Sequence, residues 1–92
     1  MNSVLENEAA AAVEAIKSPQ KLAHFVLRTG QYEAMRAWYK MVFHAVPAFE
    51  NEILTFLSYD EEHHRIALNN APDVGPQQGG QAGVHHVAFT YA

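Results

Sequence analysis

The chain has 92 residues, a formal net charge of −4 from 10 acidic and 6 basic side chains, and no cysteine. This length supports one small domain, which buries only about 60–65% of its unfolded surface and therefore gains stability from pairing with another unit. The lack of cysteine excludes disulfides and thiolate metal sites. The scattered cations form no basic stripe, which argues against nucleic-acid binding.

Residues 1–18 are predicted to form an N-terminal helix that precedes the main domain. Ser3 and Glu6 have the S-x-x-E spacing of a capping box, and the alanines at 9–12 favour a helix. Pro19 then ends it. The segment lacks the basic start of a signal peptide, and the chain has no apolar run long enough to span a membrane. We therefore expect a cytoplasmic protein without membrane contact.

Residues 19–70 carry the signals of a βαβββ module. The stretch 21–29 is short and apolar and lies between a proline and a glycine, which favours a buried strand. Over 30–46, apolar side chains recur at three- and four-residue spacing, which predicts an amphipathic helix. The remaining predicted elements are two strands within 48–60, joined by a hairpin turn at Asn51, and a strand at 63–70.

Residues 71–83 are predicted to be a linker, because they contain two prolines and four glycines. Residues 84–92 are predicted to be a strand that begins a second unit. A strand needs a neighbour to satisfy its backbone, so the sheet must be completed by a second module or a second chain. We expect a homo-oligomer, because an unclosed sheet exposes an apolar face.

Two of the six histidines occupy similar places in apolar stretches. His24 in LAHFVL shares a strand face with Leu22 and Val26, and His86 in VHHVAF has a similar setting. A lone histidine in an apolar strand is usually structural, so hydrogen bonding within a sheet is the competing explanation. Two similar strands with one histidine each also suit a shared site for iron, zinc, manganese or nickel.

The pair His63-His64 opens the strand at 63–70, so only one of the two can point inward. We expect His64 to share the face of Ile66 and Leu68 and to be the buried member. A histidine beside a metal pocket is a natural proton donor, because its pKa lies near neutrality. The competing interpretation of His64 is a polar cap at the start of a strand.

The element order, together with LAHFVLRT, AWYKMVF, FLSYDEEHHRIAL and GVHHVAFTYA, resembles the vicinal oxygen chelate superfamily over residues 21–92. Within it, the chain is most similar to the extradiol ring-cleavage dioxygenases, including the biphenyl-2,3-diol type. The resemblance implies an α+β fold, a βαβββ glyoxalase/bleomycin-resistance/dioxygenase-like module with an extra N-terminal helix. It also implies a catechol-type diol and dioxygen as substrates and Fe(II) as the metal, with Mn(II) or another divalent metal as the alternative.

In this family two histidines and one glutamate hold the metal and leave positions open for catechol and dioxygen. The resemblance assigns the metal-ligand roles to His24 and His86 and an acid–base role to His64. The glutamate ligand of the family comes late in the second module, in a DPDG-like segment that this sequence lacks. We therefore expect a fragment or short form of a dioxygenase, with Glu50 or Glu52 as internal candidates for a substitute ligand.

Two other functions are compatible with the resemblance. One is a different metal enzyme, of the glyoxalase or epimerase type. Glyoxalases carry a carboxylate ligand in the fourth strand, where this chain has Arg65, Ile66 and Ala67, and this argues against glyoxalase activity. The other is a non-catalytic module that binds a small ligand, and the presence of both His24 and His86 counts against it.

Overall fold

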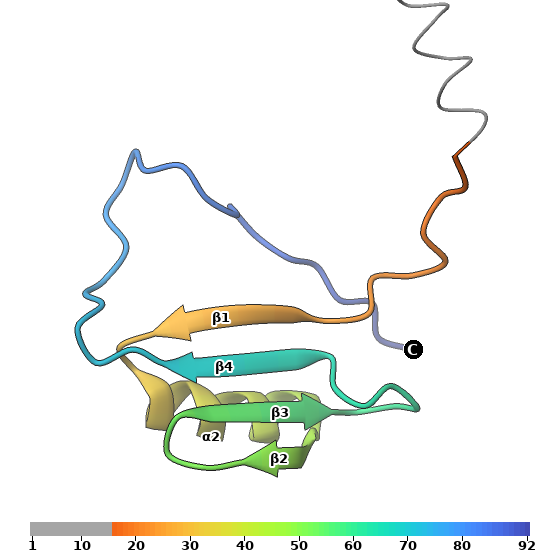
Figure 1. Cartoon of the computed structure of the whole chain (residues 1–92), viewed down its shortest axis with the longest axis horizontal. Coiled ribbons are helices and arrows are strands. Elements are labelled where there is room, and N and C mark those ends of the chain that lie inside the picture. Colours follow the sequence, from red (N-terminus) through yellow and green to blue (C-terminus); the bar gives the residue numbers. More distant parts are fainter. Residues whose placement is uncertain (1–15) are drawn as a thin grey trace, which may run out of the picture.

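The computed structural model describes residues 16–92, which form one four-stranded sheet and one helix (Figure 1). The predicted α+β architecture with βαβββ order is confirmed. The helix predicted at 1–18 falls almost wholly on residues outside the described range. The elements are β1 (Phe25–Thr29), α2 (Tyr32–Phe43), β2 (Val46–Glu50), β3 (Leu54–Ser58) and β4 (Ile66–Asn70).

The sheet is mixed, with the strand order β1-β4-β3-β2. β1 runs parallel to β4, with Phe25 opposite Ile66, and the other two pairs are antiparallel. α2 connects β1 to β2, the two strands at the sheet's edges, and therefore has to cross the sheet. Figure 1 shows it behind the strands, so one sheet face is covered by the helix and the other is open.

The hydrophobic core lies between α2 and the covered face of the sheet. Leu57, Ile66 and Leu68 are 0% exposed. The alternation of strand side chains explains this set, because every second residue of β3 and β4 points to the helix. The side chains that pack around them are Phe25, Leu27, Tyr32, Met35, Tyr39, Phe43, Ala45 and Phe89.

β1 differs from the fully buried strand that the sequence predicted. Phe25 and Leu27 are half-buried against the core, whereas Val26 is 58% exposed. β1 is an edge strand, and none of the residues 16–92 covers its open face. An apolar stretch of five residues cannot by itself distinguish a strand buried on both faces from an edge strand that awaits a partner.

The helix predicted over 30–46 ends earlier in the structure than expected. The helix ends at Phe43, and His44 follows it in the left-handed conformation, with φ 53°. Such a residue after the last turn commonly ends a helix, and this stop precedes Pro47. Pro47 instead lies in β2, beside an irregularity in the pairing with β3. Proline is tolerated there because β2 is an edge strand.

The predicted hairpin turn at Asn51 is confirmed. Its side-chain Oδ1 accepts hydrogen bonds from the backbone N–H groups of Ile53 and Leu54, at 2.8 and 3.0 Å. An asparagine commonly closes a turn in this way, because its side chain imitates a backbone acceptor. This turn fixes the register between β2 and β3 and so places Phe56 on the open face of the sheet.

Residues 71–83, the predicted linker, contain no helix or strand. The strand predicted at 84–92 is absent, because this segment finds no hydrogen-bonded neighbour within residues 16–92. Side chains hold the segment instead. The ring centroids of Phe89 and Phe43 are 4.6 Å apart, and the Tyr91 hydroxyl donates a hydrogen bond to the Val42 carbonyl at 3.2 Å.

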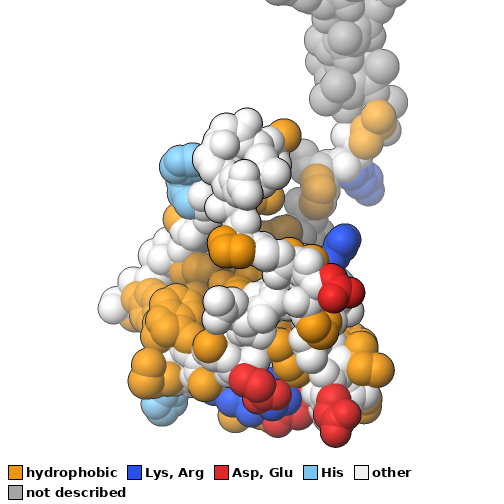
Figure 2. Space-filling model, turned by 90° about the vertical axis from the view of Figure 1, so that its left-hand side faces the viewer, with side chains coloured by type: hydrophobic (Ala, Val, Ile, Leu, Met, Phe, Trp, Pro, Cys, Tyr) orange, Lys and Arg blue, Asp and Glu red, His pale blue; other side chains and the backbone are white. Residues whose placement is uncertain are grey.

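Several hydrophobic side chains stay exposed on the part of the chain that the structure describes. They gather on the flank that α2 occupies (Figure 2), where Trp38 and Met41 are 48% and 71% exposed. On the open sheet face, Val26 and Phe49 are 58% and 50% exposed. The one helix described, α2, is too short to cross a membrane.

Candidate functional site

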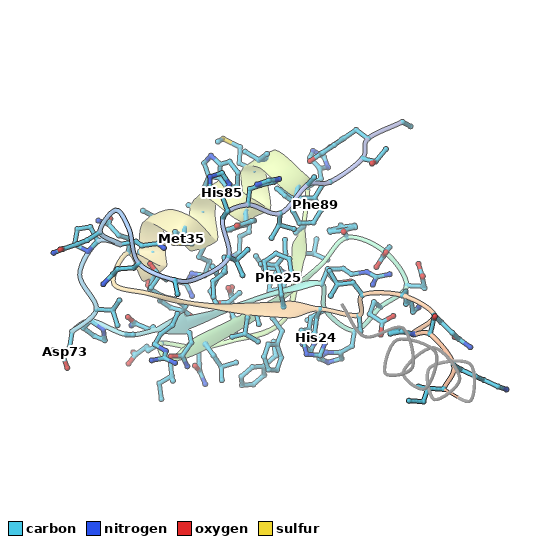
Figure 3. The ribbon with its side chains drawn as sticks, turned by 90° about the horizontal axis from the view of Figure 1, so that it is seen from above. His24, Phe25, Met35, Asp73, His85 and Phe89 are labelled. Atoms are coloured by element: carbon cyan, nitrogen blue, oxygen red, sulfur yellow. The ribbon has the colours of Figure 1, made fainter. Side chains whose placement is uncertain are left out.

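His24 and His64 meet on the open face of the sheet. Their ring centroids are 4.0 Å apart, and the His64 ring stacks on Phe56 at 4.4 Å with an interplanar angle of 13°. His24 directly precedes β1 and points away from α2, whereas the next residue, Phe25, points toward the core (Figure 3). Two imidazoles on an aromatic platform are therefore presented on the face that the helix leaves free.

The predicted orientation of His64 is corrected by the structure. We expected His64 to share the face of Ile66 and Leu68, which are fully buried under α2. His64 is half-buried on the opposite face, against Phe56 and His24. The reason is that β4 begins only at Ile66, so the bend before it breaks the alternation on which the expectation rested.

The surroundings of His64 favour its neutral form. Burial, followed by the nearby His24 and His63, lowers the pKa of the His64 imidazole below its usual value. His63 also places its Nδ1 2.9 Å from the Nδ1 of His64. A neutral imidazole has one ring nitrogen free to accept a proton, so His64 suits the role of a base at neutral pH better than that of a resident acid.

The acidic stretch before this pair is held by two cations. Lys21 Nζ lies 2.8 Å from Glu62 Oε2, and Arg65 Nη2 lies 3.0 Å from Asp60 Oδ2. These contacts lower the pKa of both carboxyl groups: Arg65 does so chiefly for Asp60, and Lys21 chiefly for Glu62. The structure thus ties this acidic stretch to the residues just before β1.

Acid should therefore weaken the stabilisation that these two ion pairs give to the fold. A carboxyl group whose folded pKa is depressed stabilises the fold above its unfolded pKa and loses that contribution as pH falls through the folded value. The ordinary values are 3.8 and 4.5 for Asp60 and Glu62, so the midpoint of thermal unfolding should fall as pH is lowered from about 5 toward 3. Circular dichroism melts across this range would measure it.

The matched control variant for this acid effect is Glu62→Gln. Its melting midpoint should depend less steeply on pH, because one carboxyl group with a lowered pKa has been removed. An unchanged slope in that variant would show that the Lys21 pair contributes nothing to the pH dependence.

His86 is not brought together with His24. The ring centroid of His86 lies 5.1 Å from that of His85, and both side chains are exposed. Figure 3 shows His85 on the α2 side of the sheet, with His24 on the other. Glu50 offers no substitute ligand near His24, because it pairs with Lys40 at 3.1 Å on β2, at the opposite edge of the sheet. Within residues 16–92, no three histidine, aspartate or glutamate side chains lie close enough to hold a metal ion.

Sequence reasoning missed two residues of this site. Phe56 forms the platform under His64, and Arg65 contacts the backbone before His24. Phe56 was identifiable only as one apolar residue of a strand. Arg65 carried a weak signal, since a cation three residues after the run Asp60–Glu62 suggests an ion pair.

The fold agrees with a family comparison. The model of the Glyoxalase/Bleomycin resistance protein/Dioxygenase superfamily matches residues 21–92, and the chain belongs to this superfamily. The chain is also similar to two curated proteins of Rhodococcus globerulus. It is 49% identical over 72 residues to biphenyl-2,3-diol 1,2-dioxygenase 2 and 47% identical over 73 residues to biphenyl-2,3-diol 1,2-dioxygenase 3.

Each of these similarities covers 77% of this chain but only 38% of the relative. The chain therefore spans less than half the length of the curated relatives that it matches. No solved structure matches it significantly. The predicted resemblance to the dioxygenase branch is confirmed at the level of family and sequence similarity.

Proposed function

We propose that this chain supplies the first-module part of an extradiol dioxygenase that opens catechol-type aromatic diols with O2. The observation that carries the proposal is the His24–His64 pair on the open sheet face, in a chain that is 49% identical over 72 residues to a biphenyl-2,3-diol 1,2-dioxygenase. Aromatic diols and O2 are the substrate class that the proposal takes from these relatives.

In this proposal His24 and His86 are ligands of a divalent metal, Fe(II) first and Mn(II) second. This requires residues 84–92 to leave the position that they have in the structure, on the α2 side of the sheet. Neutral imidazole suits both metals, and a bound metal would hold diol and dioxygen side by side. The described residues do not form a complete metal site, so this chain contributes only part of the ligand set and no reaction step is derived through the metal. The remaining ligands would come from the portion that the longer relatives have, or from a second copy of the chain.

The surroundings of His64 support the acid–base role that the resemblance implies for it. A diol must lose a proton from one hydroxyl before its ring becomes electron-rich enough to react with oxygen. His64 is half-buried, its pKa is lowered by burial, and it lies beside His24. Its imidazole would accept this proton and return it later, which is general acid–base catalysis by one group.

A chimera tests the assignment. Residues 21–92 would replace the matching segment of biphenyl-2,3-diol 1,2-dioxygenase 2, and the product would be reconstituted anaerobically with Fe(II) and then given air and 2,3-dihydroxybiphenyl. We expect the yellow ring-fission product. His24→Ala should lower kcat/KM by more than about 100-fold, since even residues that merely support metal ligands cost 10–100-fold. His64→Ala should cost about 10²–10⁴-fold, the range of general acid–base catalysis.

His44→Asn is the matched control, because His44 ends α2 and asparagine tolerates its left-handed backbone. This variant should keep full activity. A folded chimera without activity, or one equally active after loss of His24, would refute the proposed function. The same reconstitution on the 92-residue chain, followed by light scattering, would show whether a second copy completes the site, as a homo-oligomer with activity would require.

A further inference from the structure

The side chain of Arg65 ties together the two segments that carry the paired histidines. Its Nη1 donates to the carbonyl oxygens of Leu22 and Ala23, at 2.8 and 3.0 Å. Its Nε and Nη2 bind the carboxylate of Asp60, with Nε 3.1 and 3.0 Å from the two oxygens. The Arg65 side chain is only 13% exposed, although it lies at the edge of the domain.

These contacts use the particular shape of a guanidinium group. Its donors form a flat, rigid fork, so one side can bind a carboxylate while the other reaches two carbonyl groups. A lysine would keep the charge near Asp60 but has a single nitrogen on a flexible stem. Lys21 shows the contrast, because among residues 16–92 its ammonium group binds only Glu62 and Glu61, and its side chain is 48% exposed.

The contacts of Arg65 lie next to both histidines in the chain. Ala23 directly precedes His24, and Arg65 itself directly follows His64. The backbone adds a further link, since the Phe25 N–H donates to the Arg65 carbonyl at 3.1 Å. His24 lies just outside β1 and His64 just outside β4, so the paired strands end beside both residues. The Arg65 side chain adds contacts at this point, beyond the backbone bonds that the Arg65 N–H and carbonyl make to Leu57 and Phe25.

We propose that Arg65 is a positioning residue that holds His24 and His64 ring to ring on the open sheet face. The assignment of a catalytic purpose to this arrangement rests on the proposed function. The claim that Arg65 holds the two rings together does not rest on the proposed function, because it concerns only where the rings lie. Asp60 takes part in the same set of contacts, since its carboxylate orients the guanidinium group of Arg65 toward the carbonyl groups.

Nuclear magnetic resonance on the full 92-residue chain tests this positioning. Rings at 4.0 Å should give a nuclear Overhauser contact between the ring protons of His24 and His64 in the unaltered protein. In Arg65→Lys, which keeps the charge, we expect this contact to be lost while circular dichroism still shows the folded domain. A folded Arg65→Lys chain with the contact intact would overturn the proposal.

Two further variants keep the test decisive. Lys21→Met removes the neighbouring ion pair without touching the backbone before His24, so the ring contact should persist. Asp60→Asn leaves Arg65 in place but removes its anchoring charge, so the contact should weaken in a folded chain. If Arg65→Lys and Asp60→Asn both unfold, the proposal fails, because the cluster then supports the whole fold and not two histidines.

The two proposals can fail separately. An inactive chimera would refute the dioxygenase assignment and leave the ring contact unaffected. Loss of the contact only in Lys21→Met, with activity retained, would refute the role of Arg65 and leave the dioxygenase assignment standing.

Discussion

Replacing Leu68 with alanine is expected to destabilise the domain by about 2–5 kcal/mol, the range for a fully buried leucine. Leu68 is 0% exposed and lies in β4 between Leu27 of β1 and Thr55 of β3. Its loss would leave a cavity under α2, because the neighbouring side chains of β1 and β3 are held by the sheet and cannot move in to fill it. Because small domains have total stabilities of only about 5–15 kcal/mol, much of the population should unfold at modest urea concentrations.

Urea unfolding followed by circular dichroism would measure this loss. Val26→Ala is the matched control, since it also truncates an aliphatic strand residue but one that is 58% exposed. Its effect should stay within about 0.5 kcal/mol. Equal losses in the two variants would mean that the open sheet face is covered in solution, by a second copy or by residues outside the described range.

Tyr32→Phe is expected to cost about 1–3 kcal/mol, the price of leaving buried polar groups without a partner. Tyr32 is 3% exposed, and its hydroxyl lies 2.6 Å from Thr55 Oγ1 and donates to the Asn51 carbonyl at 2.8 Å. One atom thus joins the first turn of α2 to β3 and to the hairpin turn. Without it, the hydroxyl of Thr55, which is 0% exposed, would keep no strong partner.

Tyr59→Phe is the control for this change, because Tyr59 is 42% exposed and the same oxygen is removed. Thermal melts of both variants should show a clear drop in midpoint for Tyr32→Phe alone. Similar midpoints would mean that water replaces the Tyr32 hydroxyl in the core. The nuclear magnetic resonance signals of the His64 ring should not shift in Tyr32→Phe, because Tyr32 lies on the opposite side of the sheet.

Local rules determined most of the fold. The apolar period of residues 30–46 predicted α2, and the turn chemistry of Asn51 predicted the hairpin between β2 and β3. Both features depend on contacts within a short stretch, so the residues that decide them are adjacent in the sequence. The resemblance added the family, which agrees with the βαβββ order that the local patterns predicted.

The candidate site was predictable only in part. His24 and His64 were identified from the sequence, but His64 was assigned to the wrong face, because alternation was extended past the true start of β4 at Ile66. Whether His24 and His86 share a metal remains a prediction. The position of 84–92 could not be foreseen either, since a strand forms only where a neighbouring strand is present.

The sequence by itself determined the elements, their order and the family, because hydrophobic period, turn residues and motif similarity are properties of neighbouring residues. Only the tertiary structure decided that Arg65 bridges Asp60 to the backbone before His24, and that His64 stacks on Phe56. The physical reason is that Arg65 reaches a backbone segment about 40 residues away, whose position is set by the pairing of β1 with β4. The stack of His64 on Phe56 depends in the same way on the pairing of β3 with β4.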